Sequence, residues 1–312
     1  MRYIIPENEH GRTVKEILLG SVGISVTFLR HLKFIENGIM LNGEKVTVRK
    51  QVNAGDILEL ATENEKMGSR LTPSKIELDI IYEDSDLVVP SKPANMPTHP
   101  SHNHHGDTLA DALAYRYANE SEPFVFRPIN RLDRNTSGLT LIARSRISAA
   151  RLSESMRSGE IRKRYVAILD GALPSREGCI ETYMRRTSES IIVREVCNEQ
   201  DGGDYALTRY VSLAFDGRYS LVLASPETGR THQLRVHFSH LGCPIVGDDM
   251  YGSASKLIDR HALHALTLSF PHPSSKEDMR LLAPLPDDMH SLCTDIFGEN
   301  VLRALYTDRD IL

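Results

Sequence analysis

The sequence lacks long apolar runs, an excess of basic residues and paired cysteines, and each absence excludes a class of protein. No stretch reaches the roughly eighteen consecutive apolar residues that a membrane-spanning helix needs. The N-terminal residues contain Arg2, Pro6 and Glu7 and lack the apolar segment of a signal peptide. We therefore expect a cytoplasmic protein.

The cysteines are scattered along the chain. Zinc sites and disulfide frameworks need cysteines at characteristic spacings, and the sequence has none of these spacings. Thiols in a reducing compartment also stay unpaired. We expect small core residues at Cys179, Cys197, Cys243 and Cys293.

The charge of the whole chain differs from the charge of one segment. The net charge of -5 argues against a protein that binds nucleic acid through bulk positive charge. Residues 144–164 nevertheless contain a local basic excess, formed by Arg144, Arg146, Arg151, Arg157, Arg162, Lys163 and Arg164. This run is either a ridge that faces phosphates or the solvated face of a helix.

Periodicity divides the chain into two units. Residues 12–34 have the apolar spacing of two helices, and residues 39–60 have short alternating segments around an Asn42-Gly43 turn, with Val46 and Val48 in one of them. Residues 61–75 are polar and aperiodic, which indicates a linker. We predict a small domain over residues 1–60 and a larger domain over residues 76–312.

The larger domain has strands and helices in irregular order. Its patterns predict helices over residues 107–117, 145–157 and 231–241, and strands over residues 78–89, 165–169, 191–196, 205–213, 219–224 and 263–270. Regular βαβ alternation is absent, and the apolar content of 40% is ordinary for a globular protein. The fold class is therefore α+β, with a mixed, mainly antiparallel sheet flanked by helices.

One carboxylate stands between two guanidinium groups. Asp133 lies between Arg131 and Arg134 in a polar segment, and residues 124–126 and 139–143 have the pattern of short buried strands. Loops held by rigid elements often carry binding and catalytic residues. We infer a functional role for Asp133, although this run alone allows several hydrolytic or transfer chemistries.

A second polar run opens the helix predicted over residues 231–241. Thr231 is placed to cap this helix, and Arg235 shares a face with Thr231 and neighbours His232. The run is either an exposed helix start or a surface that faces a ligand. Two arginines within six residues, Arg230 and Arg235, favour the second interpretation.

Three runs occur in the order and approximate spacing of the RluA family of RNA pseudouridine synthases. They are residues 131–139, 163–167 and 229–235, and with shorter matches the resemblance extends over residues 76–286. Residues 38–43 and 52–57 resemble the RNA-binding domain of ribosomal small-subunit protein S4. The chain departs from the family at two positions, Asn130 and Asn95. Asn95 stands where glycine is usual, and we expect a positive φ angle there.

The resemblance implies isomerisation of uridine in RNA to pseudouridine, without a cofactor or a metal. It makes Asp133 the essential carboxylate, which either adds to the anomeric carbon or removes a ribose proton. It pairs Arg235 with Asp133, sets the Tyr165 ring against the uracil and places the Tyr165 hydroxyl where a proton leaves carbon 5. The alternative for Tyr165 is a strand residue that faces the core. The further residues that it implies near the substrate are Arg131, Arg230, Thr231 and His232.

The implied partner is large-subunit ribosomal RNA or transfer RNA, bound by a monomer that contacts no membrane. An RNA-binding or ribosome-associated protein without catalytic activity remains the alternative on the same scaffold. A glycoside or nucleoside hydrolase would need a second positioned carboxylate, and no motif supplies one. A histidine-rich segment suggests a metal, but we interpret it as a loop that lines the substrate: His99, His102, His104 and His105.

Overall fold

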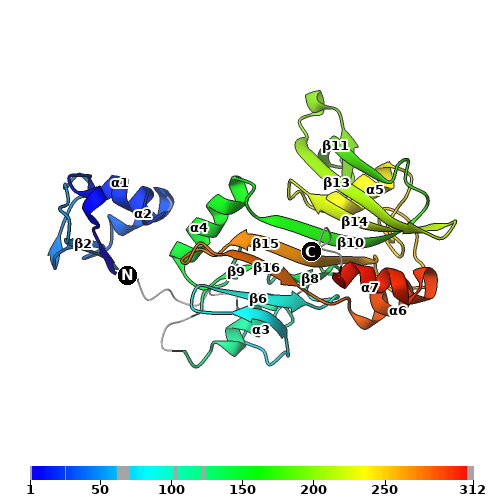
Figure 1. Ribbon diagram of the computed structural model, residues 1–312, viewed down its shortest axis with the longest axis horizontal. Coiled ribbons are helices and arrows are strands. Elements are labelled where there is room, and N and C mark those ends of the chain that lie inside the picture. Colours follow the sequence, from blue (N-terminus) through cyan, green and yellow to red (C-terminus); the bar gives the residue numbers. More distant parts are fainter. Residues whose placement is uncertain (1, 25, 62–70, 102–103, 121–123, 308–312) are drawn as a thin grey trace.

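The computed structural model describes residues 2–24, 26–61, 71–101, 104–120 and 124–307 (Figure 1). Two β-sheets organise these residues, one of four strands and one of twelve strands. Helices flank both sheets, so the α+β fold class is confirmed. No helix among the described residues is long and apolar enough to cross a membrane.

The N-terminal part combines two short helices with the four-stranded sheet. Its elements are β1 (Arg2–Ile4), η1 (Glu7–Glu9), α1 (Val14–Leu19), α2 (Val26–Leu32), β2 (Ile39–Leu41), β3 (Glu44–Lys45) and β4 (Ile57–Leu60). Thr13 and Glu16 form a capping box that starts α1. Asn42 and Gly43 have φ angles of 53° and 81°, as a tight β2–β3 turn requires, which confirms the predicted turn.

Two predictions in this part are wrong. The second helix ends at Leu32, and Phe34 is 90% exposed instead of facing the core. Val46 and Val48 follow β3 without belonging to a strand, although both pack against the core of this part. Apolar spacing therefore located the packing residues better than it located the element ends.

The twelve-stranded sheet carries the rest of the described chain. Its strands are β5 (Asp79–Glu83), β6 (Leu87–Lys92), β7 (Arg127–Pro128), β8 (Ser137–Leu139), β9 (Ile142–Ala143), β10 (Arg162–Asp170), β11 (Glu177–Arg186), β12 (Arg194–Cys197), β13 (Asp204–Phe215), β14 (Tyr219–Pro226), β15 (Leu263–Pro271) and β16 (Asp278–Leu282). The main path runs β12-β11-β13-β14-β10-β15-β8-β6-β9-β7. Every described pair of strands is antiparallel except β15 and β8, which are parallel.

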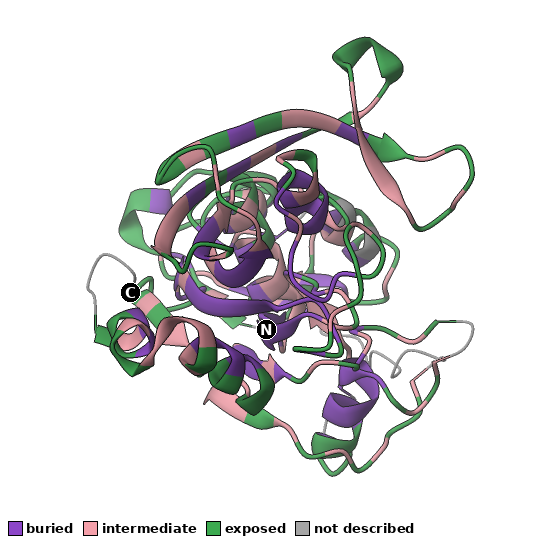
Figure 2. Ribbon diagram, turned by 90° about the vertical axis from the view of Figure 1, so that its right-hand side faces the viewer, coloured by how far each residue is buried: buried purple, intermediate pink, exposed green. Residues whose placement is uncertain are grey.

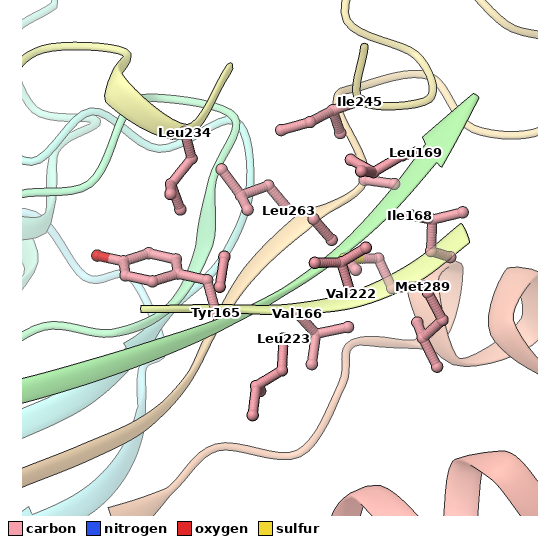
Figure 3. Packing of buried hydrophobic residues seen from close by; sticks show 14 of the residues in the cluster. Tyr165, Val166, Ile168, Leu169, Val222, Leu223, Leu234, Ile245, Leu263 and Met289 are labelled. Carbon is pink, nitrogen blue, oxygen red and sulfur yellow. The ribbon is translucent and has the colours of Figure 1, made fainter. Parts of the chain in front are cut away.

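Among the described residues, five α-helices and one short 3-10 helix accompany this sheet: α3 (Leu109–Arg116), α4 (Arg146–Arg157), η2 (Glu199–Asp201), α5 (Gln233–His240), α6 (Asp287–Phe297) and α7 (Glu299–Thr307). Buried residues gather in the strands at the middle of the molecule (Figure 2). The largest core cluster joins β10, β14 and β15 to α5 and α6, and Tyr165 and Leu234 lie together at one end of it (Figure 3). The predicted site therefore borders the largest core cluster.

Two residues of the basic run at 144–164 make contacts within the protein. Arg144 pairs with Glu120, and the Arg151 Nη1 donates to the carbonyl of Pro273 at 3.0 Å. Arg151 Nε also donates to the Val22 carbonyl at 3.2 Å, which ties α4 to the N-terminal part beside it (Figure 1). Arg157 and Arg162 are exposed, and the interpretation of the run as a ridge that faces phosphates stays a prediction.

Several strand and core predictions also need correction. Residues 124–126 form no strand, and β7 begins at residue 127. Ile191 is 80% exposed and precedes β12, which begins at Arg194. Cys243 and Cys293 are buried as expected, but Cys179 is exposed. Most of the predicted linker, residues 62–70, lies outside the described residues.

Candidate active site

Asp133 lies on the loop between β7 and β8, and side chains from distant segments hold the backbone of this loop. Three of its carbonyls accept hydrogen bonds: Leu132 from Thr98 Oγ1 at 2.9 Å, Arg134 from Lys92 Nζ at 3.1 Å, and Asn135 from Arg260 Nη1 at 3.1 Å. Carbonyls on both sides of Asp133 are therefore anchored. This arrangement fixes the direction of the carboxylate before a substrate binds.

Lys92 is the most buried of these anchors. Its side chain is fully buried, and its Nζ also donates to the carbonyls of Pro93 and Met96 at 2.8 Å each. Burial lowers the pKa of Lys92 to about 7, and the nearby charge of Asp133 opposes that shift. Three acceptors around one ammonium group compensate part of the cost of burying it.

The end of the Asp133 loop packs against β15 without space for a side chain. Gly138 has a φ angle of 110°, and a Cβ atom there would lie 2.3 Å from the carbonyl oxygen of Ala265. Next to it, Ser137 Oγ lies 2.9 Å from His264 Nδ1. The close parallel pairing of β8 with β15 thus requires glycine at this position.

The turn before α5 has an unusual backbone conformation. His232, not Thr231, occupies the N-cap position, with a φ angle of 59° and no capping hydrogen bond from its side chain. Thr231 is exposed, so its predicted role as the helix cap is wrong. Gln233 holds the turn instead, because its Oε1 accepts from Thr228 Oγ1 at 2.7 Å and from the Arg230 amide at 3.0 Å.

Arg235 links Asp133 to a second, buried carboxylate. Its Nε and Nη2 donate to the two oxygens of Asp248 at 2.7 and 2.8 Å, and its Nη1 lies 3.6 Å from Asp133 Oδ2. The two-bond fork therefore binds Asp248, and Asp133 faces the remaining nitrogen. The Arg235 side chain is only 6% exposed, in contrast to the expected position away from the core.

Asp248 is rigidly held for this task. Its side chain is fully buried, and its Oδ1 also accepts from the backbone amides of Met250 and Tyr251 at 3.1 and 3.2 Å. Burial raises the pKa of Asp248, but the hydrogen bonds and charge of Arg235, the charge of His261 and the Tyr251 amide together outweigh burial and hold that pKa below its ordinary value. An ionised Asp248 orients Arg235 as a fixed cation beside Asp133.

Tyr165 and His232 complete the surroundings of Asp133. Tyr165 lies on β10 and is 7% exposed, and burial, followed by the charge of Asp133, raises the pKa of its hydroxyl. The His232 Nε2 lies 3.9 Å from Asp133 Oδ2, and burial lowers the pKa of its imidazole. Asp133 itself is 27% exposed, so this carboxylate is the accessible group within a largely buried set.

The two remaining arginines of the predicted site are exposed and interact with other groups. Arg230 pairs with Asp204, at the start of β13. Arg131 is exposed as well, and its charge adds to burial in lowering the pKa of His99. The structure thus places both arginines outside the largely buried set around Asp133.

The sequence analysis assigned no role to Lys92, Asp248 or Tyr251, although all three lie within residues 76–286, over which the resemblance extends. Sequence patterns do not report that a carboxylate and an arginine thirteen positions apart are partners. Their hydrogen bonds appear only in the folded chain.

The histidine-rich segment shows one local ion pair. His104 Nδ1 lies 2.6 Å from Asp107 Oδ2, while His102 falls outside the described residues. The ring of His99 packs against Phe126 with 5.1 Å between the ring centroids. In the described part of the chain, no group of three or more histidine, cysteine or acidic residues is placed to hold a metal.

Comparisons with known proteins show the family of the chain. A family profile described as RNA pseudouridylate synthase matches residues 86–240. The chain is 38% identical over 289 residues to the uncharacterized RNA pseudouridine synthase YjbO of Bacillus subtilis, covering 92% of this chain and 99% of that protein. It is 31% identical to ribosomal large subunit pseudouridine synthase D of Xanthomonas campestris, covering 96% and 94%.

A solved structure supports the same relationship. The human RNA pseudouridylate synthase domain containing 1 has a TM-score of 0.57 and 30% identity to this chain, covering 70% of this chain and 89% of that one. Both the sequence and the fold therefore match RNA pseudouridine synthases. The chain belongs to the RluA family of RNA pseudouridine synthases and is an isomerase that acts on RNA.

Proposed function

We propose that Asp133 is the carboxylate that attacks the ribose of the target uridine. The observation that carries this proposal is its position: it is the accessible carboxylate beside a buried arginine, Arg235, at 3.6 Å. Arg235 places a positive charge beside this carboxylate, and a nucleophile or base acts as the carboxylate ion. The partial exposure of Asp133 gives a flipped nucleotide access to it.

The bonds and protons of the isomerisation balance. The N1–C1′ bond breaks, the uracil turns, a C5–C1′ bond forms, C5 loses a proton and N1 gains one. Asp133 either forms a transient bond to C1′ or takes the C2′ proton as the uracil leaves. Both routes use the ionised carboxylate that this site provides.

Tyr165 in this proposal packs against the uracil as a neutral phenol. Burial raises the pKa of its hydroxyl, so the group keeps its proton at neutral pH. A protonated phenol does not serve as the first acceptor of the C5 proton. Its contribution is the apolar ring surface, which replaces stacking that the base loses on leaving the RNA.

We assign large-subunit ribosomal RNA as the substrate. Modification of transfer RNA is the alternative result of the mapping experiment described below. Support comes from relatives named ribosomal large subunit pseudouridine synthase D, which align over 94% of their length in two cases. The protein acts in this proposal as a cytoplasmic monomer. The site of modification is then a uridine that loop and shape contacts select.

The N-terminal residues 1–60 act in this proposal as an RNA-binding domain like that of ribosomal protein S4. A pocket of about 470 Å³ there has apolar lining from Leu32, Ile39, Val46 and Val48. Cations line the same pocket: Lys33, Lys45 and Arg49. Apolar and basic side chains in one pocket suit a nucleotide, because the base and the phosphate meet complementary groups.

Mapping of pseudouridine in total RNA tests the proposal. Cells that lack the protein are compared with cells that regain the wild type, Asp133→Asn or the control Asp278→Asn, whose exposed carboxylate lies on β16. We expect one or more sites to vanish and to return with the wild type and the control only. Restoration by Asp133→Asn would remove Asp133 from the mechanism, and an unchanged map would favour a noncatalytic RNA-binding protein.

A further inference from the structure

Tyr251 lies at the centre of the contacts behind Asp133. Its hydroxyl accepts a hydrogen bond from the Arg194 amide at 2.9 Å and lies 2.8 Å from His232 Nδ1. Its ring lies under the Arg235 guanidinium, 5.0 Å from the centroid. Tyr251 therefore contacts both side chains that face Asp133.

The loop that carries Tyr251 is fixed to the same helix as these side chains. The Tyr251 amide donates to Asp248 Oδ1 at 3.2 Å, and its carbonyl accepts from Ser239 Oγ at 2.6 Å. Ser239 belongs to α5, which also carries Arg235. The position of the phenol relative to His232 is thus set by contacts on both sides.

These contacts determine which imidazole nitrogen of His232 carries the proton. The backbone amide of Arg194 is a donor only, so the Tyr251 oxygen accepts from it. The Tyr251 hydroxyl then donates its proton to a hydrogen bond with His232 Nδ1, which must be an unprotonated acceptor. In the neutral ring the proton consequently lies on Nε2, the nitrogen that faces Asp133.

The charge of Asp133 favours the same tautomer of His232. The Nε2 atom is 3.9 Å from Asp133 Oδ2, where a protonated nitrogen is attracted by the carboxylate and a lone pair is repelled. Burial lowers the pKa of His232, which favours a neutral ring that donates without adding a second cation beside Arg235. The separation needs to shorten by roughly one ångström for a hydrogen bond, as catalytic contacts do when substrate binds.

His232 is also held in a conformation that few residues adopt. Its φ of 59° lies in the left-handed region, where a non-glycine residue is uncommon and often functional. At this N-cap position the side chain makes no capping hydrogen bond, and its Nε2 faces Asp133 Oδ2 instead. The backbone and the Tyr251 hydrogen bond thus serve the same placement.

We propose that Tyr251 is a positioning residue that sets the tautomer of His232, so that Nε2–H of His232 and Nη1 of Arg235 both hold Oδ2 of Asp133. The opposite oxygen, Oδ1, is then the reacting atom. This inference rests on the proposed role of Asp133. Oδ1 either bonds to C1′ while the N1–C1′ electron pair leaves with uracil, or takes the C2′ proton while a C1′–C2′ double bond forms. His232 keeps its proton in both routes.

The tautomer is measured directly by NMR on the full chain with ¹⁵N-labelled histidine. The His232 signals are assigned by their loss in His232→Asn, because asparagine tolerates a positive φ. We expect a protonated Nε2 and a hydrogen-bonded, unprotonated Nδ1 in the wild type. In Tyr251→Phe, the Nδ1 shift should move toward the average of both tautomers. A wild-type proton on Nδ1, or unchanged shifts in Tyr251→Phe, would overturn the proposal.

A second experiment measures the turnover of the same variants. RNA from cells lacking the protein, with tritium at C5 of uridine, releases tritium to water as the C5 proton leaves. We expect Tyr251→Phe and His232→Asn each to lower kcat about 10-fold with KM unchanged, and the double variant to lose no more than either. A kcat equal to wild type, a change confined to KM, or additive losses would refute the relay.

The control variant is Tyr82→Phe, which removes a tyrosine hydroxyl bonded to Asp84 at 2.9 Å, outside the site. It should keep the wild-type kcat and the wild-type shifts of His232. A wild-type protein that releases no tritium would refute the proposed function. The tautomer in the NMR experiment would still decide the arrangement of Tyr251 and His232.

Discussion

Replacement of Asp248 by asparagine should destabilise the protein and reduce its turnover. The amide keeps the shape of the carboxylate and an acceptor for the backbone amides, but it removes the charge that faces Arg235. Arg235 is then a buried cation whose remaining partner is Asp133, at 3.6 Å. We expect the guanidinium to shift toward Asp133, which moves the carboxylate from its working position.

The size of the effect follows from burial. Removing one partner of a buried ion pair costs about 3–5 kcal/mol of folding free energy. Asp133 keeps a negative charge 3.6 Å from the guanidinium in the variant, so Arg235 is not left without any counter-charge. We therefore expect a loss near the lower limit, about 3 kcal/mol, which lowers Tm by about 6–12 °C for a domain of this size.

Urea and thermal unfolding of three variants measure this loss. Asp170→Asn is the matched control, because Asp170 also receives two bonds from an arginine, Arg218, but both side chains of this pair are exposed. We expect this control to cost much less stability than Asp248→Asn. The double variant Arg235→Met with Asp248→Asn should regain most of the lost stability, since it buries no unpaired charge.

Two results would contradict this reasoning. If Asp248→Asn melts at the same temperature as the wild type, the charge of Asp248 does not compensate a buried cation. If the double variant is no more stable than Asp248→Asn, the loss comes from the loop around residue 248 and not from the unpaired Arg235.

Three further predictions concern pH, the backbone and the guanidinium. Burial lowers the pKa of His237 and of His264 to about 4, so the unfolded chain binds more protons between about pH 4 and pH 6.5. Stability should fall by about 2 kcal/mol per histidine from about pH 7 to about pH 5, with a smaller fall in His237→Gln, as measured by urea midpoints. Gly138→Ala should cost at least ~3 kcal/mol, because its Cβ would overlap the Ala265 carbonyl; unchanged unfolding would refute this. Arg235→Lys keeps the charge but loses the fork to Asp248, so kcat should fall by roughly 10-fold or more in the tritium assay, and wild-type turnover would count against the fork.

The fold was predictable where a local pattern has a physical cause within a few residues. The β2–β3 turn followed from Asn42-Gly43, because these residues tolerate positive φ. Asn95 has the expected positive φ, at 60°, for the same reason. Ends of elements were harder to predict: Ile191 is apolar but 80% exposed, since its neighbours in space leave it uncovered.

The candidate site was predictable as a set of motifs and not as a geometry. Asp133, Tyr165 and Arg235 follow from the resemblance, and the structure brings them together. The sequence did not indicate that Arg235 makes its two-bond fork to Asp248. It also did not indicate that His232, and not Thr231, occupies the N-cap position of α5. Both depend on how the turn before α5 meets the loop after residue 244.

The sequence by itself determined the family and the reaction, because its motifs resemble those of the RluA family, and it predicted Asp133 as the central carboxylate. Only the tertiary structure decided which groups surround Asp133 and which oxygen they hold. The physical reason is that hydrogen bonds and buried charges act over about 3–4 Å in space, between segments that lie far apart in sequence. Lys92, Asp248 and Tyr251 gain their roles from that proximity.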